Sequence, residues 1–96
     1  MPRDHHFQLN GKRWLWRFTR LRGAAVGWTF MKDPKNQQVR ERVLIDERLR
    51  GRSRLETIIH EALHALNPTH SEEHVTQQAA DIARILWFLG YRPTEE

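Results

Sequence analysis

The amino-acid sequence predicts an α+β fold, in which a small antiparallel sheet of three to four strands packs on two helices. Two observations support this class. Apolar residues recur with a period of two in the first half of the chain, as in strands, and at helical spacing after residue 53. Strands and helices that are segregated along a chain are typical of α+β layers. With 96 residues, we expect one domain over residues 1–96 with a modest core.

The first two strands are predicted to form a hairpin. Trp14, Trp16 and Phe18 occupy every second position, so their side chains share one face of a strand that begins near residue 12. Residues 7–9 form the partner strand, because the Asn-Gly pair at 10–11 supplies the positive φ angles of a type I′ turn.

Two further strands are predicted at residues 25–30 and 39–46. Turn-forming residues at 22–23 and 33–36 separate them from their neighbours. The aromatic residues expected in the core are Trp14, Trp16, Trp28 and Phe30. Their spacing explains burial against the following helix, without a role as a platform that stacks nucleic-acid bases.

A half-buried helix is predicted over residues 53–66. Its apolar positions recur at helical intervals and are Leu55, Ile58, Ile59, Ala62, Leu63 and Leu66. Ser53 and Glu56 have the spacing of a capping box, which begins a helix. Asn67 and Pro68 end the helix one turn after His64.

This helix carries the sequence His60-Glu61-Ala62-Leu63-His64, the H-E-x-x-H motif of zinc metallopeptidases. Histidines four residues apart project from one helix face and can bind a single Zn²⁺. Glu61 is placed beside the metal, where it can take a proton from zinc-bound water and pass it to a leaving amine. The motif therefore predicts a zinc cofactor, with His60 and His64 as ligands and Glu61 as the catalytic base.

Catalytic zinc needs a third protein ligand besides water. The candidates downstream are His70, Glu72, Glu73, His74 and Asp81. His70 completes the spacing of metzincins, with Asn67 in place of the turn glycine. Against this interpretation, Pro68 restricts the backbone of Asn67, and no methionine follows Met31 to form the metzincin methionine turn.

A second helix, from an N-cap at Ser71 to a stop at Gly90, offers a different ligand. Its apolar arc consists of Val75, Ala79, Ile82, Ala83, Leu86 and Leu89. Glu72 lies at the margin of this arc, whereas Glu73 points away, and a carboxylate near a buried face is costly unless it is paired or bound to metal. Glu72 is therefore the predicted third ligand. The rival ligands that stay open are His70 and Glu73, and the residues expected in supporting or surface positions are His74 and Asp81.

With these residues the chain resembles the zincin superfamily of metallopeptidases, specifically its minimal gluzincin-like domains. The resemblance covers residues 39–90, and Glu72-x-x-Val75…Ala79 is similar to the glutamate-bearing helix of small phage and bacterial metallopeptidases. It implies a zinc-dependent peptidase that acts on a peptide or protein substrate, with a glutamate of the second helix as the third ligand. The resemblance does not specify which substrate.

Composition narrows the kind of site and the compartment. The chain has no cysteine, which excludes disulfides and thiolate zinc sites and suits a reducing compartment. No apolar run approaches the roughly 18 residues of a membrane span, and residues 1–6 lack the apolar core of a signal peptide. We therefore expect a cytoplasmic protein without a membrane partner. The sequence indicates nothing about oligomeric state.

The basic charge of the chain supports a second hypothesis. Its formal net charge is +4 and its pI about 10.3, and arginines lead into the motif helix at every second position: Arg48, Arg50, Arg52 and Arg54. Such a ridge attracts phosphates and suggests proximity to nucleic acid. The alternative function is a basic nucleic-acid-associated binding module with a structural or vestigial zinc site. For a peptidase, the nearest downstream groups that suit an oxyanion stabiliser are His74 and Tyr91, and neither is assigned that role.

Overall fold

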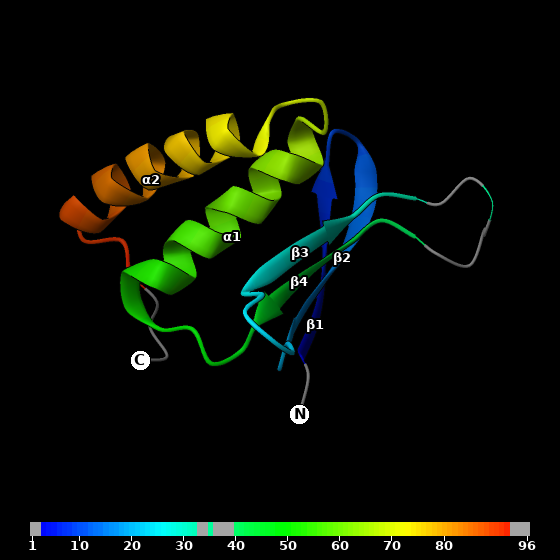
Figure 1. Cartoon of the computed structure of the whole chain (residues 1–96), viewed down its shortest axis with the longest axis horizontal. Coiled ribbons are helices and arrows are strands. Elements are labelled where there is room, and N and C mark those ends of the chain that lie inside the picture. The colour runs from blue at the N-terminus through cyan, green and yellow to red at the C-terminus, as the bar shows by residue number, and fades with distance from the viewer. Residues whose placement is uncertain (1–2, 33–34, 36–39, 93–96) are drawn as a thin grey trace.

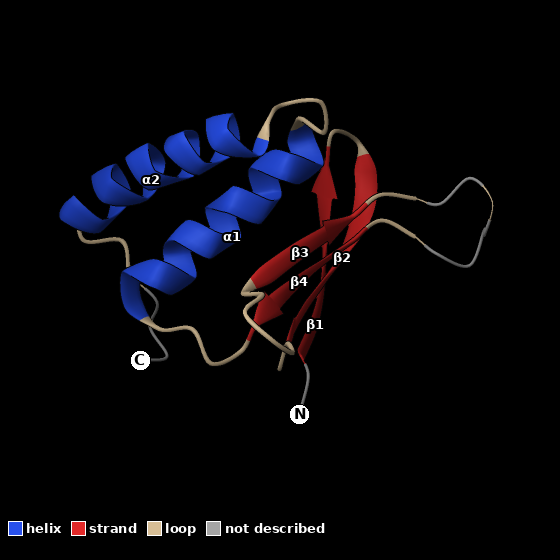
Figure 2. Cartoon of the chain, in the orientation of Figure 1, coloured by secondary structure: helices blue, strands red, loops and turns tan. Residues whose placement is uncertain are grey.

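In the part of the chain that the structure describes, four strands form one sheet and two helices lie on one of its faces (Figure 1). The structure is a computed structural model and describes residues 3–32, 35 and 40–92. Its elements are β1 (Arg3–Leu9), β2 (Lys12–Thr19), β3 (Gly27–Phe30), β4 (Arg42–Asp46), α1 (Gly51–Leu66) and α2 (Glu72–Phe88). Helix α1 packs against β3, β4 and α2 and so lies between the sheet and α2 (Figure 2). The predicted α+β class is confirmed.

The strand order is β1-β2-β4-β3, and the sheet is mixed. The pairs β1–β2 and β3–β4 are antiparallel as predicted, but β4 runs parallel to β2. The prediction of a wholly antiparallel sheet is therefore wrong for one pair. The strand that follows β2 in the sequence, β3, lies at the edge of the sheet, and β4 lies between β2 and β3. A period of two assigns side chains to faces and carries no information about this insertion.

The hairpin between β1 and β2 has the predicted turn. Asn10 and Gly11 have φ angles of 53° and 74°, and Leu9 pairs with Lys12 across the two-residue loop, as a type I′ turn requires. The side-chain amide of Asn10 also donates to the main-chain carbonyl of Leu66 at 3.1 Å. This bond satisfies one of the carbonyls left free at the end of α1 and ties the turn to that helix.

The core lies between α1 and the face of the sheet that packs on this helix, the inner face. Trp14 and Trp16 are buried there as predicted, together with Phe18, which shares their face of β2, and with Val43 and Ile45 of β4. The side chains alternate along the strands, so that residues paired across the sheet share a face.

Two aromatic residues of β3 are not part of this core. Trp28 pairs with Leu44 on the outer face of the sheet and is 50% exposed, so the prediction that it is buried is wrong. Phe30 is half-buried on the same outer face, where the guanidinium of Arg42 lies 4.6 Å from its ring centroid. Strand β3 places Gly27 and Thr29 on the inner face instead, so the prediction that Trp28 and Phe30 pack against the helix is wrong.

Strands β3 and β4 are shorter than predicted. The described strands cover residues 27–30 and 42–46, whereas the predictions extended to residues 25 and 39. Residue 39 lies outside the described residues, as do residues 33, 34 and 36 of the predicted turn.

Helix α1 begins earlier than predicted. Its N-cap is Arg50, whose side chain makes no capping bond, and Gly51 is already helical. The main-chain amide of Arg54 bonds to the carbonyl of Arg50 at 3.4 Å, so Ser53 falls inside the first turn and the predicted capping box is wrong. The helix ends at Leu66 as predicted.

Helix α2 has both predicted ends. The Ser71 hydroxyl accepts a hydrogen bond from the main-chain amide of His74 at 3.1 Å. Gly90 has a φ of 93°, and the amides of Gly90 and Tyr91 bond to the carbonyls of Trp87 and Leu86, which is a Schellman end.

The buried stripe of α2 is narrower than predicted. Val75, Ala79 and Ala83 are fully buried, whereas Ile82 and Leu89, expected on the same arc, are exposed. Helix α2 packs against α1. Only one narrow face of α2 is therefore covered. Within the described residues, neither helix combines the length and apolar composition needed to cross a bilayer.

Candidate metal centre

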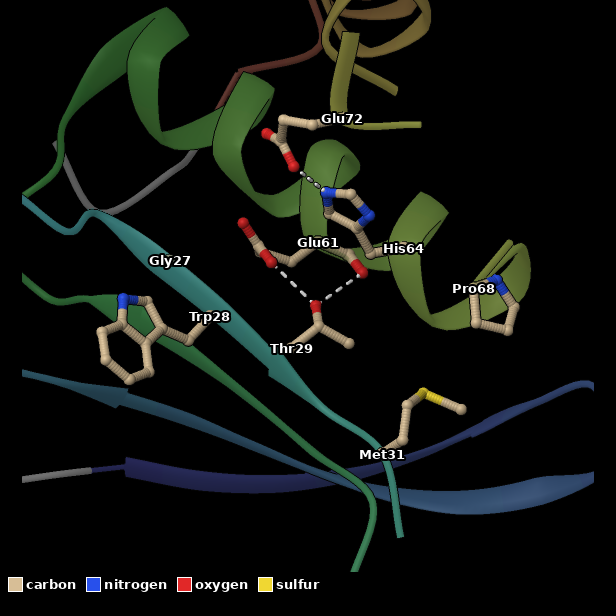
Figure 3. Close-up of a pocket in the computed structure, with 8 residues that line it drawn as sticks. All are labelled: Gly27, Trp28, Thr29, Met31, Glu61, His64, Pro68 and Glu72. Atoms are coloured by element: carbon tan, nitrogen blue, oxygen red, sulfur yellow. Dashed lines mark hydrogen bonds and ion pairs between the residues drawn. The ribbon is translucent and has the colours of Figure 1, made fainter. Parts of the chain in front are cut away.

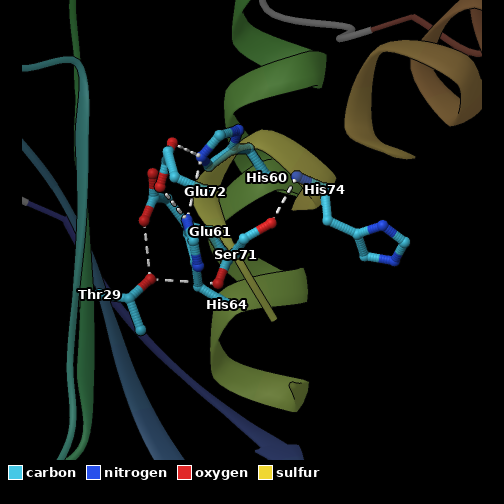
Figure 4. A network of polar contacts seen from close by, with 7 residues as sticks. All are labelled: Thr29, His60, Glu61, His64, Ser71, Glu72 and His74. Atoms are coloured by element: carbon cyan, nitrogen blue, oxygen red, sulfur yellow. Dashed lines mark hydrogen bonds and ion pairs between the residues drawn. The ribbon is translucent and has the colours of Figure 1, made fainter. Parts of the chain in front are cut away.

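His60 and His64 lie on adjacent turns of α1 and face the same way, as their spacing predicts (Figure 4). Their Nε2 atoms are 3.1 Å apart, and both side chains are about one-fifth exposed, at 19% and 21%. The two imidazoles therefore present one nitrogen each to a common, solvent-accessible point.

Glu72, the first residue of α2, completes this group. Its Oε1 lies 2.7 Å from Nε2 of His60, and its Oε2 lies 2.7 Å from Nε2 of His64. In the described part of the chain, these three residues are the group found to offer donor atoms to one metal ion, all within 4.8 Å of one another. The short turn that ends at the Ser71 cap brings the start of α2 over the two histidines.

The rival ligands lie elsewhere. The ring of His70 packs against the ring of His74, with centroids 4.8 Å apart, and Figure 4 shows His74 directed away from the three-residue group. Glu73 is exposed and does not belong to the group. Asn67 has a φ of −133°, so the left-handed turn that would favour the metzincin-type arrangement is not formed.

The remaining predicted candidates also lie apart from the group. Asp81 pairs with Arg84 at 2.6 Å on the surface of α2. Tyr91 lines a separate pocket with Leu55 and Ile58, near the start of α1. Neither His74 nor Tyr91 is therefore at the centre as an oxyanion stabiliser.

The charge of Glu72 is set by opposing effects. Burial raises the pKa of its carboxyl, whereas His60 and His64 lower it, and the net result is a pKa below the ordinary value of 4.5. The carboxylate is therefore ionised at neutral pH, which is the form that binds a cation.

The donor geometry fits a small divalent ion. Tetrahedral zinc with bonds of about 2.1 Å separates its ligand atoms by about 3.4 Å, and the donor atoms that face one another here are 2.7 to 3.1 Å apart. If these donor atoms moved apart by roughly half an ångström, the ion would fit between them. Glu72 is 70% exposed, so its side chain has room for this adjustment. Two imidazoles and one carboxylate also form a ligand set typical of catalytic zinc.

Glu61 faces β3 rather than the three donor atoms. It is only 7% exposed, and the hydroxyl of Thr29 donates to its Oε1 at 2.7 Å (Figure 3). The same hydroxyl lies 3.1 Å from the main-chain carbonyl oxygen of Glu61. The carboxylate is thus adjacent to the donor group but held by the sheet.

Thr29 and Gly27 are functional candidates that the sequence did not indicate. A Cβ atom added to Gly27 would lie 2.9 Å from Cγ of Glu61 and 2.9 Å from Cγ2 of Thr57, so glycine permits the close approach of β3 to α1. The period-two pattern puts residues 27 and 29 on one face, but it cannot identify the helix residue that they meet.

A pocket of about 360 Å³ lies between β3 and α1 beside the donor group. Its lining residues are Gly27, Trp28, Thr29, Met31, Glu61, His64, Pro68 and Glu72 (Figure 3). Two carboxylates and an imidazole are among these lining groups, and Figure 3 shows Met31 and Pro68 together on one side.

Among the described strands β3 is the terminal one, so one wall of the pocket is a sheet edge to which no described strand is paired. The amide of Asp46 bonds to the carbonyl of Val26 at 2.9 Å, and hydrogen-bonded pairs alternate along an antiparallel ladder. It follows from the register that Gly27 and Thr29, opposite Ile45 and Val43, direct their main-chain groups away from β4. These groups are available to a further extended chain.

The arginines expected to form a ridge are Arg48, Arg50, Arg52 and Arg54, and three of them are engaged within the chain. Arg48 binds the carboxylate of Asp46 at 2.6 Å. Arg50 donates to the carbonyls of Glu47 and Leu49. The guanidinium of Arg54 lies 4.6 Å from the ring centroid of Phe18. Most of the ridge therefore stabilises the approach to α1.

The chain matches no protein-family model, no curated protein and no solved structure, so the interpretation of the centre rests on its own residues.

Proposed function

We propose that the protein is a zinc-dependent peptidase, in which His60, His64 and Glu72 hold the metal and Glu61 is the general base. The observation that carries this proposal is the convergence of two imidazoles and one carboxylate beside a second, buried carboxylate that is not part of the donor group. A purely structural metal site needs its ligands and has no use for the adjacent base.

The residues divide the chemistry between them. A bound zinc ion would supply Lewis-acid polarisation of the scissile carbonyl and acidify a water. Glu61 has one carboxylate oxygen, Oε1, engaged by Thr29, which leaves Oε2 to take a proton from the attacking water. The same oxygen would return the proton to the leaving amine.

The open edge of β3 supports a peptide as the substrate. An extended peptide adds to a free edge through main-chain hydrogen bonds, and Gly27 and Thr29 direct such groups along the pocket. Main-chain pairing of this kind does not depend on side-chain identity, so it suits peptide or protein substrates generally. The absence of cysteine suits a cytoplasmic location for this activity.

The test is the change Glu61→Gln in the zinc-loaded protein. We expect metal content to stay at one zinc per chain while hydrolysis of an unfolded protein substrate falls by at least about 100-fold, because the amide cannot accept the proton. Elemental analysis and release of new amino termini measure the two quantities. The matched control is Glu73→Gln, at an exposed carboxylate outside the donor group. Undiminished hydrolysis by the Glu61 variant, or none by the zinc-loaded wild type, would contradict the proposal.

The alternative, a basic nucleic-acid-binding module, is favoured by the net charge of +4. It is weakened by the internal contacts of Arg48, Arg50 and Arg54. It also gives no role to the buried carboxylate of Glu61. Salt-dependent binding of DNA by a wild type that hydrolyses no peptide would support this module instead.

A further inference from the structure

The carboxylate of Glu61 is anchored from the sheet, across the interface between β3 and α1. Thr29 is the residue whose side chain bonds this carboxylate among the described parts of the chain, at 2.7 Å from Oε1. Glu61 is buried, so water competes little with the Thr29 hydroxyl for its carboxylate. The contact joins residues that are 32 positions apart in the sequence.

Gly27 makes this contact possible. It lies two residues before Thr29 on the same face of β3, and an added Cβ would lie 3.0 Å from Oε2 of Glu61 and 2.9 Å from its Cγ. A side chain at residue 27 would therefore push the carboxylate or the strand away. Without it, β3 approaches closely enough for the Thr29 hydroxyl to reach the carboxylate.

An anchored carboxylate differs from a free one in the use of its two oxygens. A glutamate has three rotatable bonds, and a hydrogen bond to one oxygen fixes the plane of the carboxylate and the direction of the other oxygen. Proton transfer requires that the accepting oxygen be within hydrogen-bond reach of the water. Fixing this geometry before substrate binds lowers the cost of reaching it in the transition state.

We propose that Thr29 is a positioning residue, which holds the Glu61 carboxylate through Oε1 and so fixes the direction of Oε2, the oxygen left to act as base beside the pocket. This inference deepens the proposed function and rests on it. The main-chain groups of Thr29 are directed to the free edge of β3, so the residue that orients the base also lies where a peptide would pair. Docking of the substrate and placement of the base thereby share one residue.

The test compares Thr29→Val with Thr29→Ser in the zinc-loaded protein. Valine keeps the branched shape and removes the hydroxyl, so kcat should fall by about 10- to 100-fold with KM changed less than about twofold, because binding of the peptide edge is retained. Serine restores the hydroxyl and should restore kcat to within a few fold of the wild type. Zinc content should stay at one per chain in both variants.

A second measurement does not depend on activity. In protein labelled with ¹³C at glutamate carboxyls, the Glu61 signal should shift in Thr29→Val and stay near its wild-type position in Thr29→Ser. The matched control is Thr57→Val, the same change at a threonine of α1 whose methyl group lies near Gly27. It should alter neither kcat nor the Glu61 signal.

The outcomes separate the two proposals. Wild-type kcat in the zinc-loaded Thr29→Val variant, or a serine variant as slow as the valine variant, would overturn the positioning role and leave the peptidase standing. Absence of hydrolysis by the wild type would overturn the peptidase and the positioning role with it, even if the Glu61 signal responds to Thr29. A fall in kcat with serine rescue and a matching shift of the signal would support both.

Discussion

Glu72 and Glu73 are adjacent in the sequence but have different surroundings. Successive residues of a helix point about 100° apart, so at the start of α2 only one of the two can face α1. Glu72 reaches both histidine Nε2 atoms at 2.7 Å, and these rings hold its pKa below the ordinary value against the opposing effect of burial. Glu73 is exposed. Only Glu72 is therefore placed to bind a metal ion together with the two histidines.

Alanine variants should reveal this difference. We expect Glu72→Ala to weaken zinc binding by at least about 100-fold, because it removes one of three protein ligands, whereas Glu73→Ala and His70→Ala should bind as the wild type does. Competition with a chromophoric chelator measures the affinity, and the rise in melting temperature on zinc addition checks it independently. Loss of binding in His70→Ala, with binding kept in Glu72→Ala, would instead favour the metzincin-type ligand set.

Residues that belong to a recognisable motif or helix face could be predicted, whereas the strand residues that contact them could not. The spacing of His60 and His64, and the position of Glu72 on the wheel of α2, correctly indicated three side chains that meet. Thr29 and Glu61 are 32 residues apart in the sequence. The pattern of residues within β3 cannot indicate a contact with so distant a residue. The signal of Thr29 in the sequence is no stronger than that of any other threonine in a strand.

At the scale of elements, Asp46 fastens the exit of β4 to the loop that leads into α1. Its side chain is 5% exposed and bonds to the guanidinium of Arg48 at 2.6 Å and 2.9 Å and to the amide of Arg48 at 2.9 Å. The same guanidinium reaches the main-chain carbonyl of Leu21, in the loop after β2. One ion pair thus holds two loops at the end of the sheet from which α1 departs.

This pair should make stability depend on acid pH. The hydrogen bond from Arg48 holds the pKa of Asp46 well below its ordinary value of 3.8, although burial opposes this. A lowered folded-state pKa contributes stability above the unfolded-state pKa and loses it as pH falls towards the folded-state value. Asp46→Asn should therefore lower the melting temperature at pH 7, and the difference from the wild type should narrow below about pH 4.

Melting curves between pH 7 and pH 2 measure this effect. The control is Asp81→Asn, which removes an exposed pair with Arg84 and should change the melting temperature little at any pH, since exposed ion pairs contribute little. A difference between wild type and Asp46→Asn that stays constant down to pH 2 would show that the ion pair is not its cause.

Local chemistry explains which elements could be predicted. The turn at Asn10 and the two ends of α2 depend on residues that act within a few positions, and all three were predicted correctly. The start of α1 was not, because the loop after Asp46 delivers the chain in an extended conformation at Arg50 and the helix begins there. A capping box at Ser53 is then inside the helix and has no free amides to bind.

At the scale of the whole molecule, the class of the fold followed from the sequence but the arrangement of its strands did not. Alternation identified the buried face of β2, and it is equally compatible with several orders of strands. The role of the basic residues could likewise not be inferred from the sequence. The net charge of +4 is a property of the composition, but only the fold shows that Arg48, Arg50 and Arg54 are engaged in internal contacts.

The order β1-β2-β4-β3 has a consequence for how the molecule folds, because β3 joins the sheet only through β4. Only two residues connect β1 to β2, whereas the segment that connects β2 to the parallel strand β4 includes the whole of β3. Contacts between distant segments carry a larger loop-closure entropy and form more slowly. We therefore expect the hairpin to be structured in the folding transition state and β3 to be added after it.

Stopped-flow folding and unfolding rates would show this order. Gly11→Ala strains the turn at a φ of 74° and should slow folding by about fivefold, the effect of roughly 1 kcal/mol in the transition state. Phe30→Ala, on β3, should mainly speed unfolding, and slower folding in this variant would contradict the order. Since Gly27 and Thr29 lie on β3, the wall of the pocket that contacts Glu61 would assemble after the β1–β2 hairpin.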